Sequence, residues 1–339
     1  MQELFLLGTY TRRASEGIYT IALDSEKETL TDLTLRIHED GPTYLAQSKK
    51  GFVYPVTAGN GEGGVAAYTP ENMLINAVGE TGASPCYIAI DEPRQLVYGA
   101  NYHKGQVTVY RIEANGGLTL TDSLVHTEAV GPHENQDKAH AHYADLTPDQ
   151  RLAVCDLGTD IVYTYDVSAE GTLTLVTTYQ AEPGTGPRHL SFHPNGKIAY
   201  LFGELDSTVT TLAYHAATGR FTPLQKISTL PSDYHEFNGG AAIRVTKDGR
   251  FVYASNRGHN SLAVFAVADD FTLSIVEIVA TQGDFPRDFN FNQSEEYLIC
   301  AHQNSDNLTL FKRDAQTGQL TVRQTDVYAP ECVCVVQAN

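Results

Sequence analysis

Two histidines stand two residues apart in the segment "KAHAHYADLTPDQR" (residues 138–151), just before a strand-like run and a Pro-Asp turn. Histidines at alternate positions can share a metal ion, and His133 and Glu134 lie nearby in "GPHENQDKAHAH". No third ligand follows at a metal-site spacing, so we expect no metal here. His142 is instead a candidate acid or base, because imidazole titrates near neutral pH. We interpret His140 as its neighbour, in a substrate-binding role.

Charged residues in three further parts of the chain have the chemistry to act on an anionic substrate. Arg188 follows a proline in "GPRHLSFHPNG", Arg287 does so in "FPRDFNF", and Arg257 occurs in "SNRGHNS". Glu204 stands in "GELDS". Guanidinium groups bind anions or stabilise an oxyanion, and a carboxylate can serve as a general base. Taken singly, each residue has an ordinary alternative: a surface ion pair for arginine, a turn cap for Glu204, or a structural core position for His142.

The elements that must position these side chains are strands. Helical periodicity is nearly absent, and short alternating runs rich in Val, Tyr, Thr and Phe recur between Gly, Asp, Asn and Pro. Seven such four-residue segments recur at spacings of 42 to 55 residues. They are "IYTI" ending at Ile21, "VAAY" at Tyr68, "VTVY" at Tyr110, "VYTY" at Tyr165, "VTTL" at Leu212, "LAVF" at Phe265 and "LTLF" at Phe311. Most are preceded by two further strand-like runs and followed by a fourth, which predicts seven four-stranded β-propeller blades.

The two ends of the chain predict how the ring closes. The N-terminal "ELFLLGTY" has the pattern of a second strand, so the first repeat lacks its innermost one. The C-terminal "PECVCVV" has the proline and the alternation of an innermost strand. Pairing the two segments would remove a free sheet edge. We therefore expect an all-β, seven-bladed β-propeller forming one domain over residues 1–339, in which the C-terminal strand pairs with the N-terminal blade.

Composition excludes several classes of partner. The 339 residues include 23 Lys and Arg against 41 Asp and Glu, a net charge of -18. Nucleic-acid binding relies on a concentrated basic surface, so no nucleic-acid partner is expected. No apolar run approaches the roughly 20 residues of a membrane span, and "LFLLG" is too short for a signal-peptide core; we expect no membrane partner. Five cysteines without a Cys-x-x-Cys pair favour a reduced, cytoplasmic chain.

One glycine-rich segment has the spacing of a cofactor motif. The sequence "GNGEGG" (residues 59–64) matches Gly-x-Gly-x-x-Gly, but it leads into the strand-like "VAAY". A dinucleotide site needs a helix N-terminus at that point. We interpret the segment as a turn and expect no cofactor.

Propeller geometry selects among the candidate residues. Because the strands of a blade are antiparallel, the loop entering the first strand and the loop leaving the second lie at the same mouth of the central channel. That mouth is a usual place for a propeller ligand site. Alignment of the repeats puts five candidate side chains at these two positions and predicts that they converge there: His142, Arg188 and Arg287 at the first position, Glu204 and Arg257 at the second. Such a cluster can hold an anion against the acidic total charge.

The chain resembles the seven-bladed propeller lactonases in four segments: "HAHYADLTPDQRLAVCDLGTD", "GPRHLSFHPNGKIAYLFGELDST", "DGRFVYASNRGHNSLAVF" and "PRDFNFNQSEEYLICAHQNSDNLTLF". That family includes the propeller-type 6-phosphogluconolactonases and the fungal carboxy-muconate lactonizing enzymes. The resemblance covers essentially the whole chain. It implies a metal-independent hydrolase of an anionic sugar lactone, in the first place one converting 6-phospho-D-glucono-1,5-lactone to 6-phosphogluconate.

The resemblance also implies roles for the candidate residues. Carried over residue by residue, the family's catalytic positions fall on His142, Arg188, Glu204 and Arg257. Glu204 or His142 would be the general base, and the arginines would bind the anion and the oxyanion. Arg287 would assist with the anion, and His140 matches a histidine found in only part of the family. The segments "GTYTRRASEGIYTI" and "ANYHKGQVTVY" resemble family framework without a catalytic motif.

Two other functions stay open at this point. A lactonizing cycloisomerase would form a lactone with the same set of residues. A non-catalytic propeller scaffold is a second alternative, because a fold does not determine a function. Inward-pointing acid, base and arginine side chains within hydrogen-bonding distance favour an enzyme, whereas a mouth plugged by apolar side chains favours a scaffold.

Overall fold

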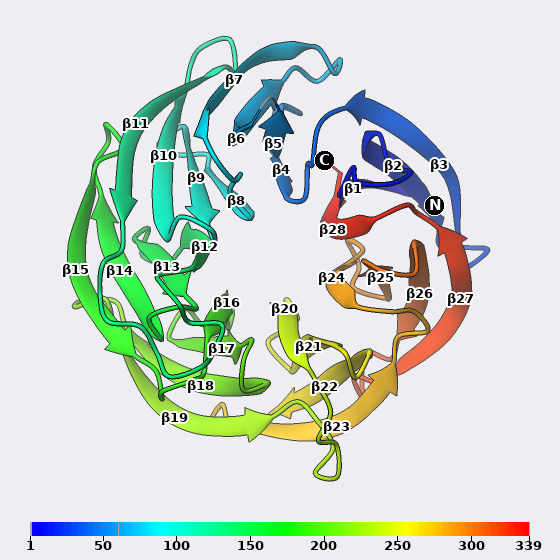
Figure 1. The fold of residues 1–339 in the computed structure, drawn as a ribbon. Coiled ribbons are helices and arrows are strands. Elements are labelled where there is room, and N and C mark those ends of the chain that lie inside the picture. The colour runs from blue at the N-terminus through cyan, green and yellow to red at the C-terminus, as the bar shows by residue number, and fades with distance from the viewer. Residues whose placement is uncertain (1, 60, 339) are drawn as a thin grey trace.

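The computed structural model describes residues 2–59 and 61–338, and every regular element in these residues is a β-strand. The strands form seven four-stranded antiparallel sheets arranged as a ring around a central axis (Figure 1). The predicted fold, a seven-bladed β-propeller with four antiparallel strands in each blade, is therefore confirmed. Residues 2–59 and 61–338 contain no helix long and apolar enough to span a membrane.

Within each blade the four strands follow one another from the axis outward. The blade that joins the chain ends contains, in that order, β28 (Cys332–Gln337), β1 (Gln2–Thr9), β2 (Gly17–Asp24) and β3 (Thr29–His38). The second blade along the chain contains β4 (Leu45–Gln47), β5 (Val53–Gly59), β6 (Glu62–Tyr68) and β7 (Leu74–Thr81). The third blade contains β8 (Tyr87–Asp91), β9 (Leu96–Asn101), β10 (Gln106–Ile112) and β11 (Leu118–Val125). The fourth blade contains β12 (Ala141–Leu146), β13 (Leu152–Asp156), β14 (Ile161–Val167) and β15 (Leu173–Gln180). The fifth blade contains β16 (Pro187–Phe192), β17 (Ile198–Gly203), β18 (Thr208–His215) and β19 (Arg220–Ser228). The sixth blade contains β20 (Gly239–Val245), β21 (Phe251–Arg257), β22 (Ser261–Val267) and β23 (Leu273–Ala280). The seventh blade contains β24 (Pro286–Phe291), β25 (Tyr297–His302), β26 (Asn307–Arg313) and β27 (Leu320–Tyr328).

The recurring four-residue segments of the sequence all lie on one strand position. Each of the seven belongs to the third strand of its blade, from β2 through β26. The glycine-rich segment 59–64 runs from the end of β5 into the start of β6, so it leads into a strand and not a helix, as predicted. Asn60, within this segment, lies outside the described residues.

The ring closes through the C-terminal strand. Strand β28 pairs antiparallel with β1, with Leu6 opposite Val336 and Leu7 opposite Val335. Figure 1 shows this red strand at the axis, beside the blue N-terminal strands. The predicted closure is confirmed. All five cysteines are free, so no disulfide contributes to it.

Buried tyrosines connect neighbouring blades. Tyr54, on a second strand, donates a hydrogen bond of 3.1 Å to the carbonyl oxygen of Gly116 in the following blade. Tyr200 and Tyr253 occupy the same position and also donate to backbone carbonyls of their following blades. A buried hydroxyl needs such a partner, so the aromatic rings fill the space between blades while their hydroxyls hold the blades in register.

Candidate active site

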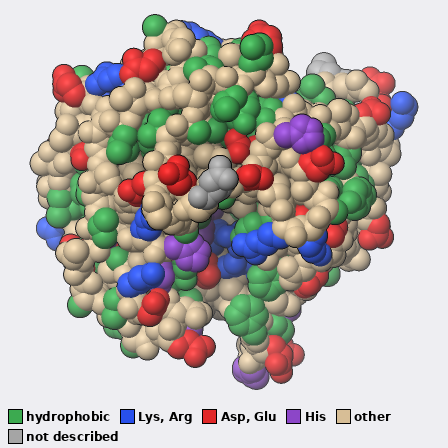
Figure 2. Space-filling model, turned by 45° about the horizontal axis from the view of Figure 1, so that its top comes forward, with side chains coloured by type: hydrophobic (Ala, Val, Ile, Leu, Met, Phe, Trp, Pro, Cys, Tyr) green, Lys and Arg blue, Asp and Glu red, His purple; other side chains and the backbone are tan. Residues whose placement is uncertain are grey.

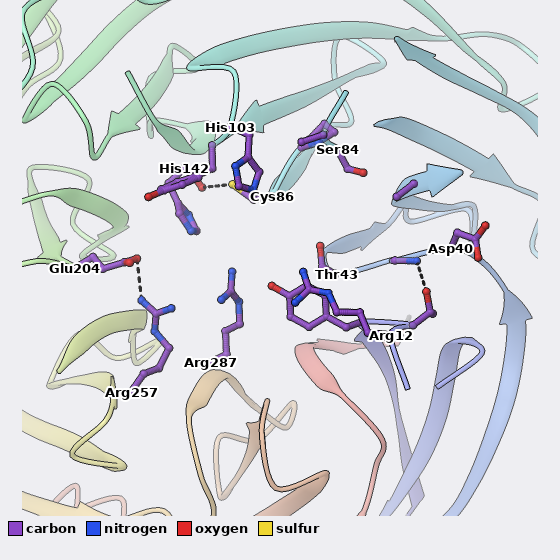
Figure 3. A pocket seen from close by; sticks show the side chains of 17 residues that line it. Arg12, Asp40, Thr43, Ser84, Cys86, His103, His142, Glu204, Arg257 and Arg287 are labelled. Carbon is purple, nitrogen blue, oxygen red and sulfur yellow. Dashed lines mark hydrogen bonds and ion pairs between the residues drawn. The ribbon is translucent and has the colours of Figure 1, made fainter. Parts of the chain in front are cut away.

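One mouth of the central channel opens into a cavity of about 530 Å³. Four of the residues selected from the sequence line it, namely His142, Glu204, Arg257 and Arg287 (Figure 3). Figure 2 shows basic and histidine side chains gathered around a hollow near the centre of this face. The structure thus brings these four side chains together, as the alignment of the repeats predicted.

Three of the innermost strands begin with an irregularity that turns a side chain toward the axis. The pairing register shifts around His142 in β12, around Arg188 in β16 and around Arg287 in β24. A β-bulge of this kind leaves one residue outside the regular alternation and re-aims its side chain. The repeated bulge explains why one aligned position of the sequence supplies the axial side chains of three different blades.

Glu204 and Arg257 come from second strands. Glu204 directly follows β17, and its backbone is held by a hydrogen bond from its N–H to the carbonyl oxygen of Gly186 and by one from Gly240 N–H to its own carbonyl. Arg257 ends β21 and donates from Nη2 to the carbonyl oxygen of Gly240, at 2.9 Å. A Cβ on Gly240 would lie 2.6 Å from the carbonyl oxygen of Gly203. Only glycine lets the two backbones approach so closely.

The centre of the site is a carboxylate held by two guanidinium groups. Glu204 Oε2 lies 2.8 Å from Arg188 Nε and 2.9 Å from Arg257 Nη2. Both arginine side chains are almost fully buried, 3% and 8% exposed, whereas Glu204 is half-buried. Burial alone would raise the pKa of Glu204, but the charges of Arg257 and Arg188 outweigh it and lower the pKa below its usual value. Glu204 is therefore ionised at neutral pH, and neither ion pair uses its second oxygen, Oε1.

His142 contributes a neutral imidazole to the cavity wall. Its side chain is buried, and its Nδ1 has no hydrogen-bond partner within residues 2–59 and 61–338. Burial, together with the charge of nearby Arg188, lowers the pKa of His142 well below its usual range. The ring lies edge-on to that of His189, with centroids 5.2 Å apart. Because His142 lines the cavity and a neutral imidazole has one donor and one acceptor nitrogen, the ring is suited to exchange a hydrogen bond with a bound molecule.

Two predicted residues lie behind this cavity and not in its wall. Arg188 lines a smaller axial space below it, where it also contacts His189 at 3.3 Å from Nη1 to Nε2. His140 is enclosed: its Nδ1 lies 2.7 Å from the carbonyl oxygen of Tyr102 and its Nε2 lies 2.8 Å from Asp137 Oδ1. The His140 ring also stacks on that of Tyr102, with centroids 4.1 Å apart. Both nitrogens of the His140 ring thus have partners in the protein, and the ring is covered by Tyr102; its predicted role in substrate binding stays a prediction.

The sequence interpretation missed one side of the cavity. Tyr10 and Arg12 from "GTYTRRASEGIYTI", and Tyr102 and His103 from "ANYHKGQVTVY", line the wall, although the sequence predicted no site residue in these segments. They follow β1 and β9, the same second-strand position that supplies Glu204 after β17. The same alignment, applied to every blade, would have found them. Polar groups of two entering loops complete this side: Asp40 and Thr43 precede β4, and Ser84 precedes β8.

The described residues offer no clear metal centre. Within the part of the chain that the structure describes, no group of three or more His, Cys, Asp or Glu side chains is arranged to hold a metal ion. Cys86 also lines the cavity, but burial raises the pKa of its thiol to about 11. The thiol is therefore protonated at neutral pH and a weak nucleophile. The groups equipped for chemistry are an ionised carboxylate, a neutral imidazole and several guanidinium groups.

Comparison with known proteins gives consistent matches over the whole ring. A family model described as "Lactonase, 7-bladed beta-propeller" matches residues 4–337. The 6-phosphogluconolactonase of Bacillus subtilis (strain 168) is 42% identical over 337 residues, which cover 97% of this chain and 96% of that protein. A solved structure of a protein from Lactobacillus plantarum is 48% identical with a TM-score of 0.99, covering 100% of both chains. The periplasmic gluconolactonase of Pseudomonas aeruginosa is 29% identical with a TM-score of 0.92, covering 100% of this chain and 99% of its own.

Proposed function

This chain belongs to the family of seven-bladed β-propeller lactonases, and from that premise we propose that it hydrolyses 6-phospho-D-glucono-1,5-lactone to 6-phosphogluconate without a metal ion. The observation that carries the proposal is the ionised Glu204, bound to Arg257 at the wall of a cavity large enough for a sugar lactone. The name of the Bacillus relative agrees with this substrate. The five free cysteines fit a reducing compartment, and we expect the activity in the cytoplasm.

Hydrolysis needs a base for the attacking water and a donor for the oxyanion. We assign the first role to Glu204, because Oε2 carries both ion pairs and Oε1 is left to accept a proton. Water attacks the lactone carbonyl, its oxygen bonds to carbon, and its proton passes to Glu204. Arg257 then lies beside the negative charge that develops on the carbonyl oxygen and stabilises it.

Collapse of the tetrahedral intermediate completes the reaction. The bond from the carbonyl carbon to the ring oxygen breaks, and the proton held by Glu204 returns to that oxygen as it becomes a hydroxyl. His142 is neutral and lines the cavity, so we assign it to orienting the water or the leaving oxygen by a hydrogen bond. The product is a hydroxy acid, which loses its own proton at neutral pH.

Two residues behind the cavity act by positioning others. Arg188 holds Glu204 from below and fixes the direction of its carboxylate. His140 holds Tyr102, whose ring lines the cavity. The hydroxyl groups of the sugar would meet the polar wall formed by Asp40, Thr43 and Ser84. A scaffold has no need of such a set, which is why we favour the enzyme over a non-catalytic propeller.

The test is hydrolysis of freshly made 6-phosphoglucono-δ-lactone, with each rate corrected for spontaneous ring opening. We expect enzyme-dependent formation of 6-phosphogluconate, whereas a scaffold would leave the spontaneous rate unchanged. Incubation of the protein with a muconate under the same conditions tests the cycloisomerase alternative. Lactone formation from the muconate, without hydrolysis of the sugar lactone, would replace the proposal with that activity.

A further inference from the structure

Two arginines at the rim of the cavity, Arg12 and Arg287, contact an aromatic ring and have no carboxylate partner in an ion pair within the described residues. Arg12 Cζ lies 4.0 Å from the centroid of the Tyr10 ring, and Arg287 Cζ lies 5.9 Å from the same centroid. Arg287 Nη1 also donates to Gln303 Oε1, at 3.2 Å. In contrast to Arg257, neither guanidinium forms an ion pair with a carboxylate among residues 2–59 and 61–338. Their positive charges are thus available to a ligand.

The rim arginines lie beside the reacting groups and not among them. In Figure 3, Arg287 points into the cavity between Arg257 on one side and Arg12 on the other, and Glu204 lies beyond Arg257. Arg12 is exposed, Arg287 is half-buried, and Arg257 is almost fully buried. The positive charge therefore extends from the buried base and oxyanion donor outward to the rim. A ligand with a carbonyl at one end and a dianion at the other matches that gradient.

The loop that carries Arg12 is fixed by a buried carboxylate from the other end of the chain. The side chain of Glu331, which is only 3% exposed, accepts hydrogen bonds from four consecutive backbone N–H groups: Arg12 at 3.1 Å, Arg13 at 2.9 Å, Ala14 at 3.1 Å and Ser15 at 3.1 Å. Burial would raise the pKa of Glu331, but these hydrogen bonds lower it below the usual value. The carboxylate is ionised, and it imposes one conformation on the loop.

Glu331 is itself anchored by its surroundings. Its N–H donates to Asp306 Oδ1 at 2.8 Å, and its carbonyl oxygen accepts a hydrogen bond from the N–H of Tyr10 at 3.0 Å. Asp306 Oδ1 also lies 2.7 Å from Arg13 Nη2. The segment that leads into the closing strand β28 therefore holds the loop after β1, on which Arg12 and Tyr10 lie. The contacts of Glu331 and Asp306 with the loop after β1 therefore join the two ends of the chain and also fix the part of the cavity rim that carries Arg12.

We propose that Arg12 and Arg287 form the subsite that recognises the phosphate of the substrate, and that Glu331 is the positioning residue that holds Arg12 in it. This inference rests on the proposed lactonase function and names the specificity determinant of that same site. A phosphate monoester carries close to two negative charges at neutral pH and offers three acceptor oxygens. Two guanidinium groups that form no ion pair within the described residues match both its charge and its hydrogen-bonding capacity.

The deciding measurement is the ratio of KM values for two substrates, glucono-δ-lactone and its 6-phosphate. Arg12→Gln should raise KM for the phosphorylated lactone by about tenfold, the scale of one charged hydrogen bond, with kcat unchanged. On glucono-δ-lactone, which has no phosphate, the rise in KM should be several-fold smaller, so that the ratio of the two KM values changes. Lys138→Gln is the matched control: it removes a positive charge that acts on the cavity residue His103, but Lys138 does not line the cavity. It should leave the KM ratio unchanged.

The positioning role of Glu331 is tested separately, by the KM for the phosphorylated lactone and by inhibition with inorganic phosphate. Glu331→Gln should raise KM for the phosphorylated lactone in the same direction as Arg12→Gln, because one backbone N–H acceptor becomes a donor. Inorganic phosphate, used as a competitive inhibitor, should bind more weakly to both variants. Should Glu331→Gln not fold, Glu331→Asp keeps the charge but shortens the reach, and it should give a smaller rise in the same KM.

Failure of the phosphate subsite differs from failure of the proposed function. A wild type that hydrolyses neither lactone would overturn the function and the subsite together. A wild type that hydrolyses the phosphorylated lactone, with an unchanged KM ratio in Arg12→Gln, would overturn the subsite alone. An unchanged ratio in a folded Glu331 variant, with the ratio changed in Arg12→Gln, would overturn the positioning role.

Discussion

Replacing Glu204 with glutamine tests the centre of the proposed mechanism. Glu204→Gln keeps the shape of the side chain and removes both its charge and its basicity. The amide cannot take a proton from water, so kcat should fall by about 10²-fold or more, the range for loss of a general base. KM should change little, because the rim arginines and the polar wall, which we propose to bind the substrate, are untouched. The split between kcat and KM separates a base from a residue that only binds.

Glu204→Gln should also lower the free energy of unfolding, by an amount that follows from the ion pairs that Glu204 forms. Glu204 is the counter-charge of Arg188 and Arg257, whose side chains are 3% and 8% exposed. Removing one partner of a buried pair leaves charge uncompensated and typically costs about 3 kcal/mol. In a chain of this size, that corresponds to a fall in melting temperature of about 5 °C. A stability loss of this size leaves the variant folded at assay temperature.

A matched control separates chemistry from stability. Asp91 ends β8 and is fully buried; its carboxylate lies 2.5 Å from Arg94 Nε and accepts a hydrogen bond from Tyr98 at 2.7 Å. It does not line the cavity. Asp91→Asn should therefore lower the melting temperature in a similar way but retain kcat. The assay is initial rate on fresh 6-phosphoglucono-δ-lactone, and a folded Glu204→Gln variant with kcat within tenfold of the wild type would refute the assignment of Glu204 as base.

Four further outcomes follow from the same geometry. Arg257→Ala should lower kcat/KM by about 10²-fold, the scale of a lost oxyanion contact; a change confined to KM would contradict that role. His142→Asn should lower kcat by about tenfold, since it removes the imidazole that orients water or leaving group, and a kcat equal to the wild type would contradict the orienting role. Because the pKa values of Glu204 and His142 are both lowered, kcat on glucono-δ-lactone should stay level from pH 7 to about pH 5 and fall only as the carboxylate is protonated below its usual value; a step near pH 6.5 would indicate an unshifted histidine. Chelation with EDTA should leave activity unchanged, whereas loss and recovery with calcium or zinc would establish a metal.

The fold was predictable because its information is local and repeated. The sequence of each blade has the same alternation of apolar and polar residues, the same turn residues and a similar spacing. A misassigned strand in one repeat therefore does not change the predicted number of blades. The bulge residues His142, Arg188 and Arg287 were found for the same reason: they occupy one aligned position in three blades. Arg12 and His103 follow second strands, as Glu204 does, so the same reasoning applied to every blade would have identified them.

Other parts of the site have no sequence signal that could have predicted them. Glu331 caps the loop at Arg12 from more than 300 residues away, and only the closed ring brings the two together. The sequence also does not show how far from the cavity a side chain lies, because this distance depends on how the surrounding side chains pack. Arg188 and Arg287 share a sequence position and a bulge, but Arg188 turns below the cavity to reach Glu204 and Arg287 stays at its wall. His140 lies two residues from His142, and contacts with Tyr102 and Asp137 remove it from the cavity.

The charge of the cavity is compatible with the anion binding that we propose for so acidic a chain. The net charge is -18, yet among the described residues the cavity wall contains two acidic side chains, Asp40 and Glu204, against Arg12, Arg257 and Arg287. At physiological ionic strength, exposed charges beyond about 8 Å are largely screened, whereas partly buried charges are screened much less. At low ionic strength, where this screening is weak, the acidic total charge should slow the approach of a dianion, whereas the arginines of the cavity act on it at close range. Salt should consequently raise the association rate for the phosphorylated lactone through screening of the outer surface, while the buried Glu204–Arg257 pair keeps the reacting centre intact.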